Sequence, residues 1–162
     1  MIQPRSIFET LHNSYHAMVL QMCTGFVNGD KDVAADLSQE VFINVWNALP
    51  TFRNESSHKT WIYRIAVNTC LQYIRKSKNK SRVPIEHAGS VHDQTGHEEE
   101  RANELMKAIG QLENVDRLVI MMVLDQLEYE EIARVIGISE NNLRVKIHRI
   151  KQKLKTLLNH GE

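Results

Sequence analysis

Residues 128–155 (EYEEIARVIGISENNLRVKIHRIKQKLK) constrain the fold more than any other stretch of the sequence. Apolar residues recur at helical spacing on both sides of Gly137-Ile138-Ser139, which predicts two helices joined by a tight turn. Glycine can take the left-handed conformation that ends a helix, and Ser139 can cap the next helix by accepting a bond from a backbone N–H. The second helix then has one apolar stripe, formed by Leu143, Ile147, Ile150 and Leu154. This pattern is typical of a helix-turn-helix, whose second helix enters the DNA major groove.

The charges of the C-terminal half are unevenly distributed. Residues 139–162 contain six lysines or arginines and two acids, whereas residues 98–138 contain ten acids and four bases. A formal net charge of zero therefore hides a basic helix beside an acidic segment, the electrostatic pattern of a helix that binds nucleic acid. The alternative is an amphipathic helix with a solvated basic face, or cations that favour a helix C-terminus.

The composition favours an all-α protein. Only three prolines and seven glycines occur among 162 residues, and 42% of the chain is apolar, which is enough to build a core. No apolar run approaches the roughly 20 residues needed to span a bilayer, and the first residues lack the apolar core of a signal peptide. Cys23 and Cys70 have no zinc-like spacing, so we expect buried, reduced thiols in a cytoplasmic protein.

Three helices are expected in the N-terminal half. Ser6-Ile7-Phe8-Glu9 has the form of a capping box, which predicts a helix from Ser6 to the break near Gly25. A second helix is expected from Asp32 to Leu49, where Pro50 stops it. Its apolar face is wide, which indicates either burial on several sides or a surface kept for a partner. A third helix is expected from about His58 to Lys76.

The start of the third helix combines aromatic and basic residues. Trp61, Tyr63 and Arg64 follow a polar loop, and six bases but no acid occur from Arg64 to Arg82. Stacking platforms beside phosphate-neutralising charge suit single-stranded nucleic acid. The other interpretation is that both aromatic residues belong to the core and that the bases are solvated.

The remaining chain is expected to form a linker and a second helical unit. Residues 81–98 lack periodicity and read as a flexible linker between a domain at 1–80 and another at 99–162. A helix is expected from Glu98, with Ala102 among its inward residues and a break at Glu113–Asp116. Leu118–Leu124 is an unbroken apolar run, which we interpret as a buried helix against which the helix-turn-helix packs.

Two stretches together resemble a known family. Residues 36–76 (DLSQEVFINVWNALPTFRNESSHKTWIYRIAVNTCLQYIRK) are similar to the second conserved region of extracytoplasmic-function sigma factors. LEYEEIARVIGISENNLRVKIHRIKQKL is similar to their fourth region. The order and spacing of the two stretches also resemble those of the family, and the resemblance covers nearly the whole chain.

The resemblance implies roles for residues of the N-terminal half. The second helix matches the surface that grips the clamp helices of the polymerase β′ subunit, through Asp36, Gln39, Glu40, Phe42 and Trp46. The loop and the third helix match the part that holds a flipped base and that reads and melts the −10 element. The residues implied there are Phe52, Asn54, Ser57, Trp61, Tyr63, Arg64, Asn68, Arg75 and Lys76. Extruding a base costs a few kcal/mol of stacking, which aromatic and amide partners can offset.

The second helix of the helix-turn-helix matches the part that binds the −35 element as a duplex. The residues implied are Ser139, Asn141, Asn142, Arg144, Val145, Lys146, His148, Arg149 and Lys151. Arginine can pair with guanine or phosphate, and asparagine with adenine. Many family members have Gly-Thr-Val where this chain has Asn141-Asn142-Leu143, and glycine where it has Asn54. The resemblance therefore does not define the promoter sequence.

The function so implied is that of a sigma factor, which binds core RNA polymerase, recognises the −35 and −10 elements and promotes DNA melting. The expected partners are the β′ clamp helices, the β flap, promoter DNA and an anti-sigma factor, without a small-molecule substrate, cofactor or membrane insertion. The alternative is an ordinary helix-turn-helix regulator whose N-terminal helices dimerise or sense a ligand. No hydrolase, zinc-protease or phosphate-loop motif indicates an enzyme. His12 and His16 could share a metal only with further ligands, since a site needs three or four.

Overall fold

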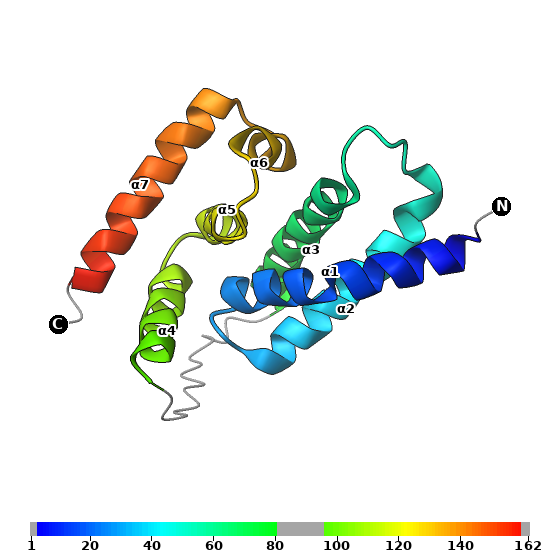
Figure 1. The fold of residues 1–162 in the computed structure, drawn as a ribbon. Helices are drawn as coiled ribbons and strands as arrows, with labels where there is room; N and C mark the ends of the chain where they lie inside the picture. Colours follow the sequence, from blue (N-terminus) through cyan, green and yellow to red (C-terminus); the bar gives the residue numbers. More distant parts are fainter. Residues whose placement is uncertain (1–2, 81–95, 160–162) are drawn as a thin grey trace.

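The computed structural model describes residues 3–80 and 96–159. Within these ranges it has seven α-helices, one short 3-10 helix and no strand, which confirms the prediction of an all-α protein (Figure 1). The helices are α1 (Pro4–Phe26), α2 (Lys31–Ala48), η1 (Leu49–Thr51), α3 (His58–Lys80), α4 (His97–Gly110), α5 (Asn114–Leu124), α6 (Tyr129–Ile136) and α7 (Glu140–Asn159). Residues 81–95 of the expected linker lie outside the described residues, and residues 97–98 already belong to α4.

The starts of the first three helices follow from single residues. The predicted capping box at Ser6 is wrong, because α1 begins at Pro4 with Gln3 as its N-cap. Proline at the first helical position has its φ angle preset and needs no hydrogen-bond partner for a backbone N–H. The Asp30 carboxylate accepts a bond from the Val33 N–H at 3.1 Å and so begins α2. The Ser57 hydroxyl accepts one from the Thr60 N–H at 3.1 Å, at the start of α3.

The helix-turn-helix forms as the sequence predicts. Gly137 ends α6 with a φ of 85°, and its N–H donates to the Ala133 carbonyl at 2.8 Å. The Ser139 hydroxyl accepts a hydrogen bond from the Asn142 N–H at 3.1 Å, which confirms its role as the cap of α7. The four apolar residues of the predicted stripe on α7 are buried.

The apolar run Leu118–Leu124 lies in a helix, as predicted, but it is buried only in part, because Leu124 at its end is 48% exposed. The helix α5 begins at Asn114, so the break expected at Glu113–Asp116 falls earlier, around residues 111–113. Ala102, which was expected to face inward, is exposed. The residues of α5 from Leu118 to Met122 are all buried, and α5 packs against α1, α3, α4, α6 and α7.

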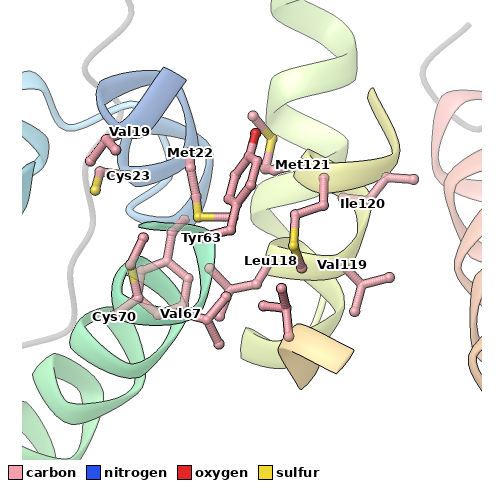
Figure 2. Packing of buried hydrophobic residues seen from close by; sticks show 14 of the residues in the cluster. Val19, Met22, Cys23, Tyr63, Val67, Cys70, Leu118, Val119, Ile120 and Met121 are labelled. Carbon is pink, nitrogen blue, oxygen red and sulfur yellow. The ribbon is translucent and has the colours of Figure 1, made fainter. Parts of the chain in front are cut away.

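The two halves of the described chain form one continuous hydrophobic core. Figure 2 shows Met22 of α1 and Tyr63 of α3 facing Met121 and Leu118 of α5. A Cβ atom on Gly25 of α1 would lie only 2.5 Å from Met121 Sδ, so a larger residue at this position would require the flexible Met121 side chain of α5 to move. The two cysteines are free and buried in the same cluster. A hydrogen bond to Cys23 and burial raise the pKa of the Cys70 thiol.

Three polar contacts accompany this apolar interface. The Tyr63 hydroxyl donates to the Asp125 carboxylate, and the same carboxylate lies 3.2 Å from the Lys59 ammonium. On the other side, the Arg117 guanidinium donates to the Phe26 carbonyl at the end of α1, at 2.8 Å. Residues Gly25, Phe26, Lys59 and Tyr63 on one side and Arg117, Leu118, Met121 and Asp125 on the other are called the α5 interface below.

The Tyr63 hydroxyl gives the α5 interface a testable pH dependence. Burial, followed by the hydrogen bond to Asp125 and its charge, raises the pKa of Tyr63 well above its ordinary value of 10.0. The folded state keeps this phenol protonated while the unfolded state loses the proton. The contribution of Tyr63 to the free energy of unfolding should therefore be complete below pH 10. Above pH 10 it should decrease, by up to about 1.4 kcal/mol per pH unit.

Urea unfolding of the wild type and of Tyr63→Phe between about pH 9 and pH 11 measures this contribution. The wild type should lose stability more steeply than the variant over this range. The difference isolates Tyr63 because every other titrating group is common to both proteins. Parallel slopes in the two proteins would contradict the buried contact with Asp125.

Candidate nucleic-acid interface

The apolar face predicted for α2 divides into a buried and an exposed part. Phe42 is buried, with its ring centre 4.6 Å from that of His12. Trp46 is 44% exposed and Ile43 is 59% exposed. Sequence reasoning missed Ile43, because it lies off the four-residue repeat that marked the apolar face.

The polar residues expected beside this surface are also exposed, namely Asp36, Gln39 and Glu40. Trp46 further lines a hollow with Pro4, Leu49 and Pro50. The structure therefore presents Ile43 and Trp46 next to acidic and amide groups, and it places Phe42 beneath them as a supporting core residue.

An aromatic cluster underlies the loop before α3. The Phe52 ring centre lies 4.7 Å from that of Trp61 and 4.9 Å from that of His58. Asn54 stands in the loop with a φ of 57°, in the left-handed region. The hydroxyl of Ser57 is the cap of α3, so its oxygen already has a backbone partner. His58 was missed by sequence reasoning, although it precedes Trp61 by three residues and so shares its helix face.

The residues predicted on α3 do not all lie on one face. At 100° per residue, Trp61, Arg64, Asn68 and Arg75 share one side, on which Arg64, Asn68 and Arg75 are exposed. Lys76 is exposed at the edge of this side, with its ammonium 4.0 Å from the Glu40 carboxylate. Tyr63 lies about 200° from Trp61 and is buried in the α5 interface. The structure therefore separates Tyr63 from the other predicted −10 residues.

The exposed side of α7 has most of the predicted −35 residues. Its exposed members are Asn141, Asn142, Arg144, Val145, His148, Arg149 and Lys151. The Arg144 guanidinium is held by the Glu140 carboxylate at 2.8 Å and lies 5.4 Å from the centre of the Tyr129 ring. Lys146 is different, because its ammonium is half-buried and lies 2.9 Å from Asp116 of α5. This contact ties α7 to α5.

The histidines of α1 lie against aromatic rings. His12 and His16 are 5.0 Å apart between ring centres, and the ring of Phe42 packs against both. No group of three or more potential metal ligands occurs within residues 3–80 and 96–159. Over the same residues, no helix has the length and hydrophobicity to cross a bilayer.

Two family models match the chain, in the order that the structure shows. Sigma-70 region 2 matches residues 11–80, which cover most of α1 and all of α2 and α3. Sigma-70 region 4 matches residues 102–154, from within α4 into α7. The two matches thus lie on either side of residues 81–95.

Relatives and solved structures agree with these matches. The chain is 30% identical over 161 residues to the ECF RNA polymerase sigma-E factor of Escherichia coli K12, covering 90% of this chain and 83% of the relative. It is 27% identical over 160 residues to the ECF RNA polymerase sigma factor SigM of Bacillus subtilis, covering 96% and 94%. The sigma factor RpoE of Bartonella quintana, solved with the anti-sigma factor NepR, has the same fold. The TM-score is 0.80 at 21% identity, covering 94% of this chain and 96% of that one.

The helix-turn-helix, the basic α7 and the helical N-terminal half are therefore parts of a two-region transcription initiation factor rather than of a classical enzyme. The chain belongs to the extracytoplasmic-function (ECF) sigma factors of the sigma-70 family.

The backbone of Asn54 gives a test of the loop before α3. A left-handed φ disfavours a residue with a Cβ atom, except where a short polar side chain bonds locally, whereas glycine tolerates it. Asn54→Ala should therefore destabilise the protein by roughly 1–2 kcal/mol, and Asn54→Gly should have little effect. The free energy of urea unfolding measures both. Arg53→Ala, at a neighbouring position without a positive φ, is the control, and equal stability of Asn54→Ala and the wild type would contradict the loop conformation.

Proposed function

We propose that this protein is a promoter-specificity subunit of RNA polymerase, which binds core polymerase through α2, reads the −35 element with α7 and opens the −10 element with α3. The proposal rests on the presence of both sigma regions, in order, in one chain. Within these regions, α7 has an exposed basic face and α3 has an aromatic, basic face. The proposed place of action is the cytoplasm, because that is where the polymerase transcribes.

The polymerase contact is proposed for the exposed side of α2. Trp46 and Ile43 offer apolar area in the centre, and Asp36, Gln39 and Glu40 offer polar contacts around it. An aromatic anchor within a polar rim is the usual organisation of a protein interface. Phe42 is buried beneath this side of α2, so we propose that it supports the contact surface rather than touching the polymerase.

Base capture is proposed for the loop before α3. Phe52 and Trp61 provide flat apolar surface against which a flipped base can stack, at about 1–3 kcal/mol per base, and Asn54 brings an amide to the loop. Arg64, Asn68 and Arg75 continue along the outward side of α3, where cations can follow the phosphates of the separated strand. Stacking energy of this size offsets the cost of unpairing.

Recognition of the −35 element is proposed for the outward side of α7. Arg144 is oriented by Glu140 and Tyr129, so less of its rotamer freedom is lost on binding. Asn141 and His148 lie one turn before and one turn after it, Arg149 lies further around the same exposed side, and all three can meet base edges in the major groove. The contact between Lys146 and Asp116 favours a positioning role for Lys146.

The packed chain is too short to reach both promoter elements at once. Elements centred at −35 and −10 are about 25 base pairs apart, or roughly 85 Å at 3.4 Å per pair. A compact chain of 162 residues is only about 40 Å across. The α5 interface must therefore open before α3 and α7 bind one promoter, and opening also releases Tyr63.

A disulfide across the α5 interface tests this requirement. An ideal Cβ atom on residue 25 lies 3.0 Å from Met121 Cγ, the position that the sulfur of a cysteine at residue 121 would take. A disulfide places the Cβ atom of one cysteine about 3 Å from the sulfur of the other, so cysteines at positions 25 and 121 can be joined. The Gly25→Cys/Met121→Cys protein should support promoter-directed transcription when reduced and lose at least about 90% of it when oxidised, because a covalent tie prevents opening.

Reduction of the oxidised protein should restore its activity. The wild type, treated identically, controls for oxidation of Cys23 and Cys70. Full activity of the cross-linked protein would show that the α5 interface does not have to open.

If α2 and α7 have separate roles, substitutions in α7 should weaken promoter binding alone and a substitution in α2 should weaken core polymerase binding. Arg144→Ala and Arg149→Ala should each weaken promoter binding by about 1 kcal/mol or more and leave the affinity for core polymerase unchanged. Trp46→Ala should weaken core binding by about 2 kcal/mol. Core affinity by fluorescence titration and promoter affinity by band shift, at one fixed salt concentration, measure both. Variants that lose both activities together would argue against this division.

An ordinary helix-turn-helix regulator explains α6 and α7 but leaves the region 2 match at residues 11–80 without a role. The RpoE structure was solved with an anti-sigma factor, and we propose that this chain also binds an anti-sigma factor. Such a partner would act by covering the exposed side of α2, since it is the surface that core polymerase is proposed to need.

A further inference from the structure

The exposed face of α7 has an apolar centre. At 100° per residue, Val145 lies about 200° from Leu143 and therefore points away from the buried stripe. Its side chain is 51% exposed. Asn141 precedes Val145 by one turn, and His148 and Arg149 follow it by one turn, and all three are exposed.

The stability of the domain does not explain a valine at this position. A β-branched residue is a weaker helix former than alanine, lysine or arginine, and an exposed side chain adds little to the core. Single apolar residues do occur on protein surfaces. Here, however, amides and cations surround Val145 on a helix that is proposed to enter the major groove, so the chemistry of the groove determines what the valine meets.

The major groove offers one strong apolar group, the C5 methyl of thymine, among hydrogen-bond donors and acceptors. A valine pressed against those polar edges would remove their water without replacing the hydrogen bonds, which is unfavourable. Against a methyl group, both partners lose apolar surface to each other, which is favourable. We propose that Val145 is a specificity-determining residue that contacts the C5 methyl of a thymine in the −35 element. This inference rests on the function proposed for α7.

Deoxyuridine tests the contact, because it lacks only the C5 methyl of thymine. The probe is the wild-type holoenzyme bound to promoter duplexes recovered by transcription from fragmented genomic DNA. Each thymine of the −35 element, on either strand, is replaced in turn. One replacement should weaken wild-type binding roughly fourfold, the value of one buried methyl-sized group.

The Val145→Ala holoenzyme should distinguish the thymine and deoxyuridine duplexes less than the wild type does, because its shorter side chain leaves most of the C5 methyl uncovered. Gln152→Ala is the matched control, since Gln152 is exposed on the same side of α7 two turns further on, and it should keep the wild-type sensitivity.

Three outcomes would overturn the proposal. These are a −35 element without thymine, deoxyuridine without effect on the wild type, and equal sensitivity of the wild type and Val145→Ala. Failure of the proposed function would look different, because the wild-type protein would then form no holoenzyme or bind none of the duplexes.

Discussion

The burial of α5 is the interaction on which the rest of the structure depends. An unbroken run of apolar residues has no polar face to offer to water, so this short helix must be covered on several sides. It is covered by α1 and α3 of the first half and by α4, α6 and α7 of the second. This helix therefore contacts both halves, and contacts of α6 with α3 and of α4 with α1 join the halves as well. The close contact of Gly25 with Met121 shows how little space separates the two halves.

The same interface is compatible with a protein that has to open. Its centre is apolar, but polar groups flank this centre and water can solvate them again when the interface opens. At one end they are Tyr63, Lys59 and Asp125, and at the other end Arg117. Their hydrogen bonds are exchanged for bonds to water, so opening costs mainly the apolar area. The outward sides of α2 and α7 and the outward basic residues of α3 are already exposed while the α5 interface is closed, whereas Phe52 and Trp61 are half-buried and Tyr63 is buried. Closure thus restrains the distance between the exposed surfaces and keeps Tyr63 covered.

Local patterns in the sequence were sufficient to predict most of the helices. The turn at Gly137 and Ser139 follows from the conformational freedom of glycine and the capping ability of serine. The burial of residues 118–122 follows from simple hydrophobicity, which does not predict that Leu124 is exposed. Tyr63 and Asp125 are 62 positions apart in the sequence, and no local pattern around either residue predicts their hydrogen bond. Similarly, Lys146 looks like any other cation of a basic helix until α5 places Asp116 beside it. Periodicity predicted the apolar face of α2 but neither the exposure of Ile43 nor that α1 would cover Phe42 and leave Trp46 partly exposed. The roles of the site residues remain predictions.

The central claim is that the chain directs core RNA polymerase to promoters. The most direct measurement adds the purified protein to bacterial core polymerase, isolates the complex by gel filtration and maps the transcripts it makes from fragmented genomic DNA. The account predicts co-elution and start sites that core polymerase alone does not use, with shared sequences near −35 and −10. Binding of DNA without binding of polymerase would contradict it, and the helix-turn-helix would then belong to an ordinary regulator.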